Sequence, residues 1–339
     1  MNGAAHRKRI EGHRARVERR LARLPLGADA RDIAAGCRYV LRGGGKRIRS
    51  TIVLLACEAV GGAAARALDA AVAVEVMHNF TLVHDDVMDN ADARRGRPTV
   101  HTRWNPNTAL LVGDVLLGAA YASLLRTAGT GHRALAEVFT RGLLEVCDGQ
   151  GLDMEYESRE RVTAADYFRM IDRKTGALLA TAAEIGGIAG NASPARRAAL
   201  HAFGLRLGRA FQLQDDLLDV VADPDDFGKT IGGDILEGKK TFLLLEAARR
   251  ARGTDRRLIA RVMRPERGWK NADGSVTPDG AATVLEVAAL YERTGVIAET
   301  RRRVRRATGE ALQHLRRLPD NAPRQALAWL AGALITRGS

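Results

Sequence analysis

Three cysteines are all that this chain of 339 residues contains, and they exclude two common kinds of stabilisation. Cys37, Cys57 and Cys147 lack the short spacing of zinc ligands, and an odd number does not suit a disulfide framework. The chain therefore fits a reducing compartment, and we expect a cytoplasmic protein.

Aromatic residues and long apolar runs are also scarce. Only 4% of the residues are aromatic, and they do not alternate with the basic segments as in a single-strand nucleic-acid platform. Acidic residues accompany most arginines, so the net charge of +13 does not indicate nucleic-acid binding. Charges interrupt each apolar run, and no apolar stretch follows the basic N-terminus. The sequence thus predicts neither a transmembrane segment nor a secretory signal.

Helical periodicity is what the chain does have, along nearly its whole length. Strand-like alternation is absent, so we expect an all-α protein: a basic lead-in over 1–28, then a single large helical bundle over 29–339. Stretches 64–83 and 174–190 are apolar nearly all round, which favours central positions. Apolar residues recur with a period of 3.6 over 29–41, 47–60, 64–90, 107–127, 133–149, 174–190, 194–222, 234–252, 281–296, 297–316 and 323–336.

Local signals mark two helix starts and one long loop. Ser193 before Pro194 is typical of a helix N-terminus, and Thr163 with Asp166 predicts a second start. The segment 265–280 is rich in turn residues and is predicted to be an exposed loop.

The stretch that carries most chemistry ends the apolar run 64–83. Asp85 and Asp89 are four residues apart, so they share one helix face, where like charges are unfavourable unless a cation bridges them. Such a pair suits Mg²⁺, which takes carboxylate oxygens and keeps other positions for water or phosphate. Arg94 and Arg95 follow directly, and guanidinium groups grip diphosphate. His78 lies on the same face as Asp85, two turns away.

A second stretch repeats this arrangement. Asp215 and Asp219 have the same spacing after an apolar run, and Lys229 and Lys239 follow. Either motif alone could be a solvated acidic helix end. The repetition favours a diphosphate site with several Mg²⁺ ions, with the two helices facing each other across a pocket.

Two further segments carry basic residues near glycine. In Gly43–Arg49 the glycines allow close approach to an anion, and Lys46 and Arg49 supply charge. Lys174 and Thr175 are read as a helix start, where they would bind an anion or merely cap the helix. Each of these segments is a weak signal by itself.

Taken together, the motifs resemble the trans-type isoprenyl diphosphate synthases of the polyprenyl synthetase family. The resemblance runs from about residue 30 to the C-terminus, with the motifs in the family's order. Ser50 departs from it, because the family usually has proline there; this should change helix entry and not chemistry. The matching motifs are GGGKRIRS at 43–50, EVMHNFTLVHDDVMDNADARRGRPTVH at 75–101, RKTGALL at 173–179, GRAFQLQDDLLD at 208–219 and FGKTIGGDILEGKKT at 227–241.

The resemblance implies the isoprenoid synthase fold with a central active-site cavity, usually as a homodimer, and chain elongation of an allylic diphosphate by isopentenyl diphosphate. Gln150 and Asp153 resemble a cavity-lining segment, and Lys240 leaves open which lysine of 239–240 points inward. The implied catalytic groups are Asp85, Asp86, Asp89, Asp215, Asp216, Lys174 and Lys229, with Mg²⁺ on Asp85, Asp89, Asp215 and Asp219. The implied isopentenyl diphosphate ligands are Lys46, Arg49, His78 and Arg95, and the allylic diphosphate ligands are Arg94, Lys174, Thr175, Gln212, Lys229 and Lys239.

Product length is implied by the residues just before the first motif, Phe80 and Thr81 with Met77. A single aromatic five positions upstream resembles synthases of the twenty-carbon geranylgeranyl diphosphate, with the fifteen-carbon farnesyl product as the alternative. Phe80 lies about 140° from Asp85 on a helical wheel, so its place in the tunnel rests on the resemblance, and ordinary core packing stays open.

Two other functions remain as alternatives. A class I terpene cyclase shares the ionisation chemistry, but it typically has one DDxxD motif and lacks an isopentenyl diphosphate pocket. A non-catalytic partner subunit tends to lose an aspartate motif, and this chain retains both.

Overall fold

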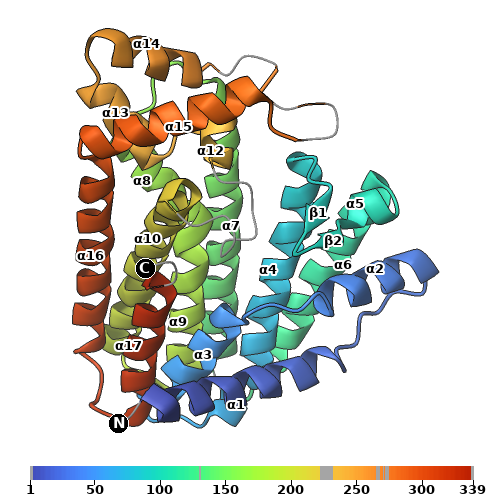
Figure 1. Ribbon diagram of the computed structural model, residues 1–339. Helices are drawn as coiled ribbons and strands as arrows, with labels where there is room; N and C mark the ends of the chain where they lie inside the picture. Colours follow the sequence, from blue (N-terminus) through green and yellow to red (C-terminus); the bar gives the residue numbers. More distant parts are fainter. Residues whose placement is uncertain are drawn as a thin grey trace. The chain divides into compact units, whose positions relative to one another are not determined.

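The computed structural model describes residues 3–129, 131–221, 232–264, 268–269, 271 and 275–336, and these are almost entirely helical, so the all-α prediction is confirmed (Figure 1). Two-residue strands β1 (Ala93–Arg94) and β2 (Arg97–Pro98) form an antiparallel hairpin. The helices are α1 (Gly3–Leu21), α2 (Arg31–Leu41), α3 (Ile48–Ala59), α4 (Leu68–Met88), α5 (Val100–Arg103), α6 (Pro106–Leu125), α7 (His132–Ser158), α8 (Ala164–Ile171), α9 (Ala177–Ala189), α10 (Pro194–Val221), α12 (Gly233–Leu236), α13 (Phe242–Arg250), α14 (Gly253–Val262), α15 (Pro278–Arg293), α16 (Val296–Leu315) and α17 (Ala322–Ile335), with a 3₁₀ turn at Ala64–Ala67 and a π turn at Asp172–Gly176.

The chain is organised in two compact units, and each is described by itself. Unit 1 comprises Met1–Leu144, Leu178–Gly204 and Gln313–Leu330. Unit 2 comprises Glu145–Ala177, Leu205–Leu312 and Ala331–Ser339. The predicted domain boundaries stay a prediction.

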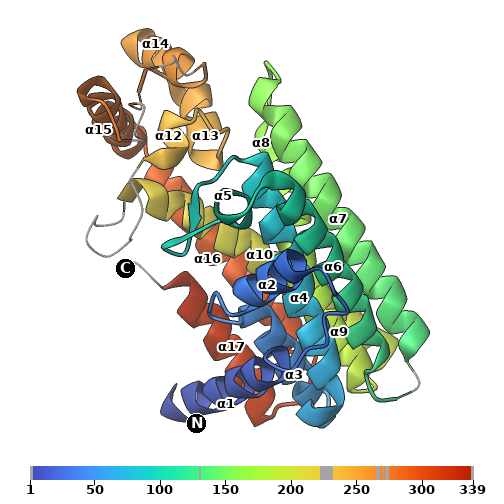
Figure 2. The same ribbon diagram turned by 90° about the vertical axis from the view of Figure 1, so that its right-hand side faces the viewer.

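Helix α4 is the centre of unit 1. Its residues 70–77 are buried on every side, as the apolar stretch 64–83 predicts. Figure 1 and Figure 2 show α6 running alongside it. A Cβ at Gly113 of α6 would come within 2.1 Å of the His84 Nε2 atom, so the glycine is what allows the two helices to approach so closely.

The basic N-terminus forms a helix that the sequence periods do not predict. α1 packs against α3 and α4 and buries Val17 and Leu21. Arg9 pairs with Glu58 at 2.8 Å, and Arg20 pairs with Asp69 at 2.7 Å. The segment predicted as a lead-in is therefore packed into unit 1.

Aromatic rings gather in the core of unit 2. Tyr167 of α8 packs edge-on against Phe168, and Phe242 of α13 lies beside both rings. The predicted start at Thr163 is confirmed, because Thr163 and Asp166 form a reciprocal capping box. The start at Pro194 in unit 1 is confirmed by a hydrogen bond from the Arg196 backbone N–H to the Ser193 hydroxyl at 3.4 Å.

One predicted helix start is wrong. Lys174 and Thr175 lie inside the π turn Asp172–Gly176, between two α-helical segments of a continuous helical run. The π turn packs closely against α7 at Gly149, where a Cβ would come within 2.2 Å of the Lys174 backbone nitrogen. Backbone N–H groups of a helix N-terminus are thus not offered to an anion there, and neither reading as a helix start holds.

One statement about apolar runs also needs correction. α6 is long and apolar enough to cross a bilayer although Asp114 interrupts it; its most apolar stretch has a mean hydropathy of 1.7, and 44% of that stretch is buried inside the protein. Core helices of soluble proteins pass the same test, so this is weak evidence for a membrane span. Its exposed residues include Leu110 and Leu111.

Candidate active site

The first aspartate motif lies at the C-terminal end of α4. Asp89 is the C-cap, and its backbone N–H donates to the Asp85 carbonyl at 2.9 Å, so the predicted one-turn spacing of the two carboxylates is present. Asp85 is half-buried and Asp89 is exposed. Within the described ranges, no three His, Cys, Asp or Glu side chains form a ready-made metal cage. Two carboxylates at this spacing suit a cation that takes its other ligands from phosphate and water, as Mg²⁺ does.

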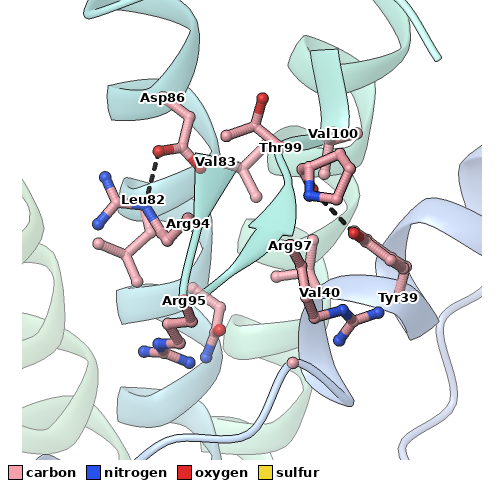
Figure 3. A pocket seen from close by; sticks show the side chains of 13 residues that line it. Tyr39, Val40, Leu82, Val83, Asp86, Arg94, Arg95, Arg97, Thr99 and Val100 are labelled. Atoms are coloured by element: carbon pink, nitrogen blue, oxygen red, sulfur yellow. Dashed lines mark hydrogen bonds and ion pairs between the residues drawn. The ribbon is translucent and has the colours of Figure 1, made fainter. Parts of the chain in front are cut away.

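Asp86 lies on a different face of α4 and has a different partner. It is buried, and its Oδ1 accepts from the Arg94 Nε at 2.6 Å (Figure 3). Burial raises the pKa of the Asp86 carboxyl, and the charge of Arg94 opposes the rise. The pair joins the end of α4 to the β1–β2 hairpin. This geometry supports a role for Asp86 in placing the hairpin that carries Arg94 and Arg95.

A cleft lies beside this hairpin. Its sides come from α2, α4 and the strands, and Arg97 covers the Tyr39 ring at 4.0 Å while the Tyr39 hydroxyl donates to the Pro98 carbonyl at 2.8 Å (Figure 3). The residues that line the cleft are Tyr39, Val40, Gly43, Asn79, Leu82, Val83, Asp86, Arg94, Arg95, Arg97, Pro98, Thr99 and Val100.

Three of the four predicted isopentenyl diphosphate ligands, Arg49, His78 and Arg95, come together in unit 1, and Lys46 is exposed. The Arg49 Nη1 lies 3.0 Å from the His78 Nε2, and Arg95 donates to the carbonyl of Gly44, two residues before Lys46. Arg95 occupies the hairpin turn with a positive φ of 55°. The structure thus joins segments far apart in sequence around one concentration of positive charge.

The protonation of this group follows from its burial. Burial lowers the pKa of His78 well below its ordinary range, and Arg49 and Arg95 lower it further. His78 is therefore neutral and accepts the Arg49 hydrogen bond through Nε2. Burial also lowers the pKa of Arg49 to about 10, and its Nε is a buried donor without a partner. Such an unpaired donor is unfavourable unless an anion engages it.

The second aspartate motif lies in unit 2, on α10. The Asp216 carboxylate is buried and accepts from the Tyr167 hydroxyl at 2.6 Å and from the Gln212 Nε2 at 2.8 Å. The Asp219 Oδ2 accepts from the Asp234 backbone N–H at 3.0 Å. Asp216 and Asp219 thus have protein partners, and Asp215 is half-buried.

The charges around this motif favour a cation. Burial raises the pKa of Asp219 to about 6, and the charge of Asp234 adds to the rise. Burial and Asp234 likewise raise the pKa of Asp216. Because these carboxylates repel one another, a divalent cation among them would relieve the repulsion.

Lysines and a threonine complete the predicted set in unit 2. The Lys174 Nζ lies 2.6 Å from the Asp153 Oδ2, and the Thr175 hydroxyl donates to the Gln212 Oε1 at 2.8 Å. Gln212 therefore links Thr175 to Asp216. Gln150, predicted beside Asp153, has a buried Oε1 without a partner.

The structure also distinguishes the two adjacent lysines. Lys239 lies 3.4 Å from Asp234, and although burial alone would lower its pKa, Asp234 and Asp216 raise it. Lys240 instead donates to three backbone carbonyls at the end of α7. Lys239 is thus the one that lies among the aspartates. Lys229 falls outside the described residues.

The residues assigned to product length lie on α4. Met77 is fully buried, and Phe80 is buried with its ring edge-on to His84 at 4.8 Å between centroids. The Thr81 hydroxyl donates to the His78 carbonyl at 2.9 Å. This packing is compatible both with a floor under a substrate tail and with ordinary core.

Sequence reasoning missed Tyr167 and Asp234, the partners of the second motif. It also missed Glu75, a buried carboxylate of α4 that contacts Arg47 and Ser50. No local signal marks Tyr167, which lies 49 residues from Asp216. Glu75 did carry a local signal in the sequence, because a lone carboxylate inside a buried apolar helix needs a partner.

Comparison with known proteins adds to this geometry. The sequence profile of the polyprenyl synthetase family matches residues 31–273. The short chain isoprenyl diphosphate synthase of Methanothermobacter thermautotrophicus is 37% identical over 301 residues, 88% of each chain. The geranylfarnesyl diphosphate synthase of Natronomonas pharaonis is 37% identical over 320 residues, again 88% of each.

Solved structures share the fold. Geranylgeranyl pyrophosphate synthetase from Pyrococcus horikoshii Ot3 superposes with a TM-score of 0.90 at 34% identity, covering 98% of this chain and 99% of that one. A polyprenyl synthase from Caulobacter crescentus CB15, solved with calcium and isoprenyl diphosphate, has a TM-score of 0.85 at 28% identity and covers 100% of this chain and 98% of that one.

Proposed function

The chain belongs to the polyprenyl synthetase family and is a trans-prenyltransferase, and we propose that it uses Mg²⁺ to join isopentenyl diphosphate to an allylic diphosphate, with geranylgeranyl diphosphate as its main product. The observation that carries the proposal is the group Arg49, His78 and Arg95, in the same unit as the carboxylates of α4. One diphosphate can be held by this positive group and a second by metal-binding aspartates. A cyclase, which ionises a single substrate, has no use for the first of these sites.

The residues present fit a bound Mg²⁺. Asp85 and Asp89 would hold one ion, and Asp215 and Asp219 would contribute to others, with phosphate oxygens completing each shell. The Caulobacter structure, with its calcium and isoprenyl diphosphate, supports this assignment. Mg²⁺ would supply positive charge to the diphosphate as it departs.

Side chains of the protein bind and orient the two diphosphates. The family resemblance assigns Arg94, Lys174 and Lys239 to the allylic diphosphate, whose carbon–oxygen bond breaks to give a delocalised allylic cation. Arg49 and His78 hold isopentenyl diphosphate so that its double bond attacks that cation and forms the new carbon–carbon bond. The released diphosphate takes the proton that is then lost. Aliphatic side chains exclude water from the cation.

An assay with labelled isopentenyl diphosphate tests the function. Purified protein is incubated with Mg²⁺ and dimethylallyl, geranyl or farnesyl diphosphate, and the products are separated by chain length. We expect label in longer allylic diphosphates. Unlabelled cyclic hydrocarbon would indicate a cyclase, and activity only after addition of a second chain would indicate a partner subunit.

Product length is tested at Phe80. Phe80→Ala should lengthen the product by at least one five-carbon unit, because the ring would no longer block the growing tail. The change also removes buried apolar volume, at a cost of about 3 to 5 kcal/mol. Val74→Ala, a buried truncation about 120° round α4 from Phe80, is the control and should leave product length unchanged. An unchanged chromatogram for Phe80→Ala would show that Phe80 is core and that farnesyl or longer products depend on other residues.

We also propose that the protein is a cytoplasmic homodimer, with α6 in the interface. Leu110 and Leu111 are 44% and 53% exposed, and adjacent exposed leucines on a strongly apolar helix favour coverage by a second copy. Leu111→Glu should therefore halve the molar mass measured by light scattering. Leu285→Glu, at an exposed leucine of α15, should not. A wild-type mass of 36.6 kDa would contradict the proposal.

A further inference from the structure

Arg47 lies in the middle of the segment that supplies Lys46 and Arg49, yet its side chain has no exposed surface. It is the N-cap of α3 and has left-handed backbone angles, φ 51° and ψ 40°. Such angles cost a non-glycine residue about 1 to 2 kcal/mol. Gly44 and Gly45, just before it, also have positive φ values of 73° and 131°. This sharp turn therefore needs contacts that hold it in place.

Polar contacts from three elements hold Arg47. Its Nε donates to the Glu18 Oε1 of α1 at 2.7 Å, and its Nη2 lies 3.4 Å from the Glu18 Oε2. Its Nη1 donates to the Glu75 Oε1 of α4 at 3.2 Å, and its Nη2 donates to the Leu41 carbonyl at 2.8 Å. A guanidinium held on two sides by carboxylates can take few other positions.

The same network includes α3 and α4. The Ser50 hydroxyl donates to the second oxygen of Glu75 at 2.9 Å, so the serine found in place of the family's proline has a definite partner. Glu75 lies three residues before His78 on α4. The turn that carries Lys46 and Arg49 is thus tied to the helix that carries His78.

We propose that Glu18 is a positioning residue of the isopentenyl diphosphate pocket: through buried Arg47 it fixes the turn that presents Lys46 and Arg49 to the substrate. The proposal rests on the function given above and assigns a part in it to the N-terminal helix. Glu18 acts without touching the substrate. Its effect should appear in the affinity for isopentenyl diphosphate, since displacement of the turn moves two diphosphate ligands together.

A second ion pair of the N-terminal helix serves as a control for the role of Glu18. Arg20, two residues after Glu18, also pairs across to α4, through Asp69 near the start of that helix. This pair fastens α1 but does not reach the turn at 44–47. If α1 acts only by packing, loss of either pair should have the same effect. If Glu18 positions the turn, only its loss should weaken substrate binding.

The experiment compares Glu18→Ala, Glu18→Gln and Arg20→Gln with the wild type. Binding of isopentenyl diphosphate is measured by calorimetry without an allylic primer, so that no turnover occurs. For Glu18→Ala we expect about a tenfold rise in Kd, with the KM for the allylic primer within about twofold of wild type. Glu18→Gln keeps an acceptor for Arg47 and should recover most of the affinity. Arg20→Gln should lower the Tm and leave the Kd unchanged.

Two results would overturn the proposal: an unchanged Kd for Glu18→Ala, or an equal rise for Arg20→Gln. If Glu18→Ala does not fold, Arg47→Lys replaces it, because lysine keeps the charge but loses the two-nitrogen contact with Glu18. Wild-type protein that neither binds isopentenyl diphosphate nor incorporates it would refute the proposed function itself. Wild-type binding with unaffected variants would refute only the role of Glu18.

Discussion

Asp85→Ala and Asp215→Ala should each lower kcat by about three orders of magnitude. Each change removes one carboxylate from a proposed metal site and little apolar packing, because both residues are only half-buried. We therefore expect an unchanged helical circular dichroism spectrum beside the loss of turnover. Raising the Mg²⁺ concentration should restore a small part of the activity, since the remaining aspartates and the substrate still bind the ion weakly.

The control for the first motif is Asp32→Ala, which removes an exposed carboxylate from the first turn of α2. Its turnover should stay near that of the wild type. Addition of a chelator to wild-type protein should abolish turnover, and Mg²⁺ should restore it. Near-normal turnover of Asp85→Ala at saturating Mg²⁺ would contradict a metal role for this motif and favour a solvated helix end.

Arg49→Ala should raise the KM for isopentenyl diphosphate by about two orders of magnitude, and His78→Ala by about one. Arg49 offers a charged donor whose Nε has no protein partner, whereas His78 is neutral and can offer the diphosphate only an uncharged contact. The KM for the allylic primer should change far less. Because the pKa of His78 is depressed, His78 stays neutral on both sides of pH 7, so its titration should not alter this KM there.

Arg42→Ala is the matched control, since Arg42 is an exposed arginine at the end of α2, just before the same glycines. It removes an equal charge but no pocket contact, so both KM values should stay near wild type. Equal increases in the two KM values for Arg49→Ala would show that the assignment of the two diphosphate sites is wrong.

The parts of the site that sequence predicts well are those set by local spacing. The face shared by Asp85 and Asp89 follows from helix geometry, and the capping box at Thr163 follows from side-chain chemistry. α1 was missed because its exposed face is densely charged and its few apolar side chains give a weak pattern. Tyr167 was missed because its hydrogen bond to Asp216 spans 49 residues, and no local pattern encodes such a contact.

The hairpin shows the same limit within one short segment. The sequence places Arg94 and Arg95 directly after the first motif, but their directions depend on positive φ angles at Asn90 and Arg95. Those angles send Arg94 to Asp86 and Arg95 to Gly44. Neighbours in sequence thus have separate partners, which residue type alone does not reveal.

The π turn at Asp172–Gly176 changes the angular position, around the helix axis, of the residues that follow it. A π turn holds one more residue than a regular α-turn, so it offsets the helix by about 100°. If the same residues formed a regular α-helix, Thr175 would be rotated relative to Tyr167 by about that angle. Both side chains reach Asp216, Tyr167 directly and Thr175 through Gln212, and the offset brings them toward the same side of the helix. The extra residue therefore aligns two groups that a regular helix of this length would separate.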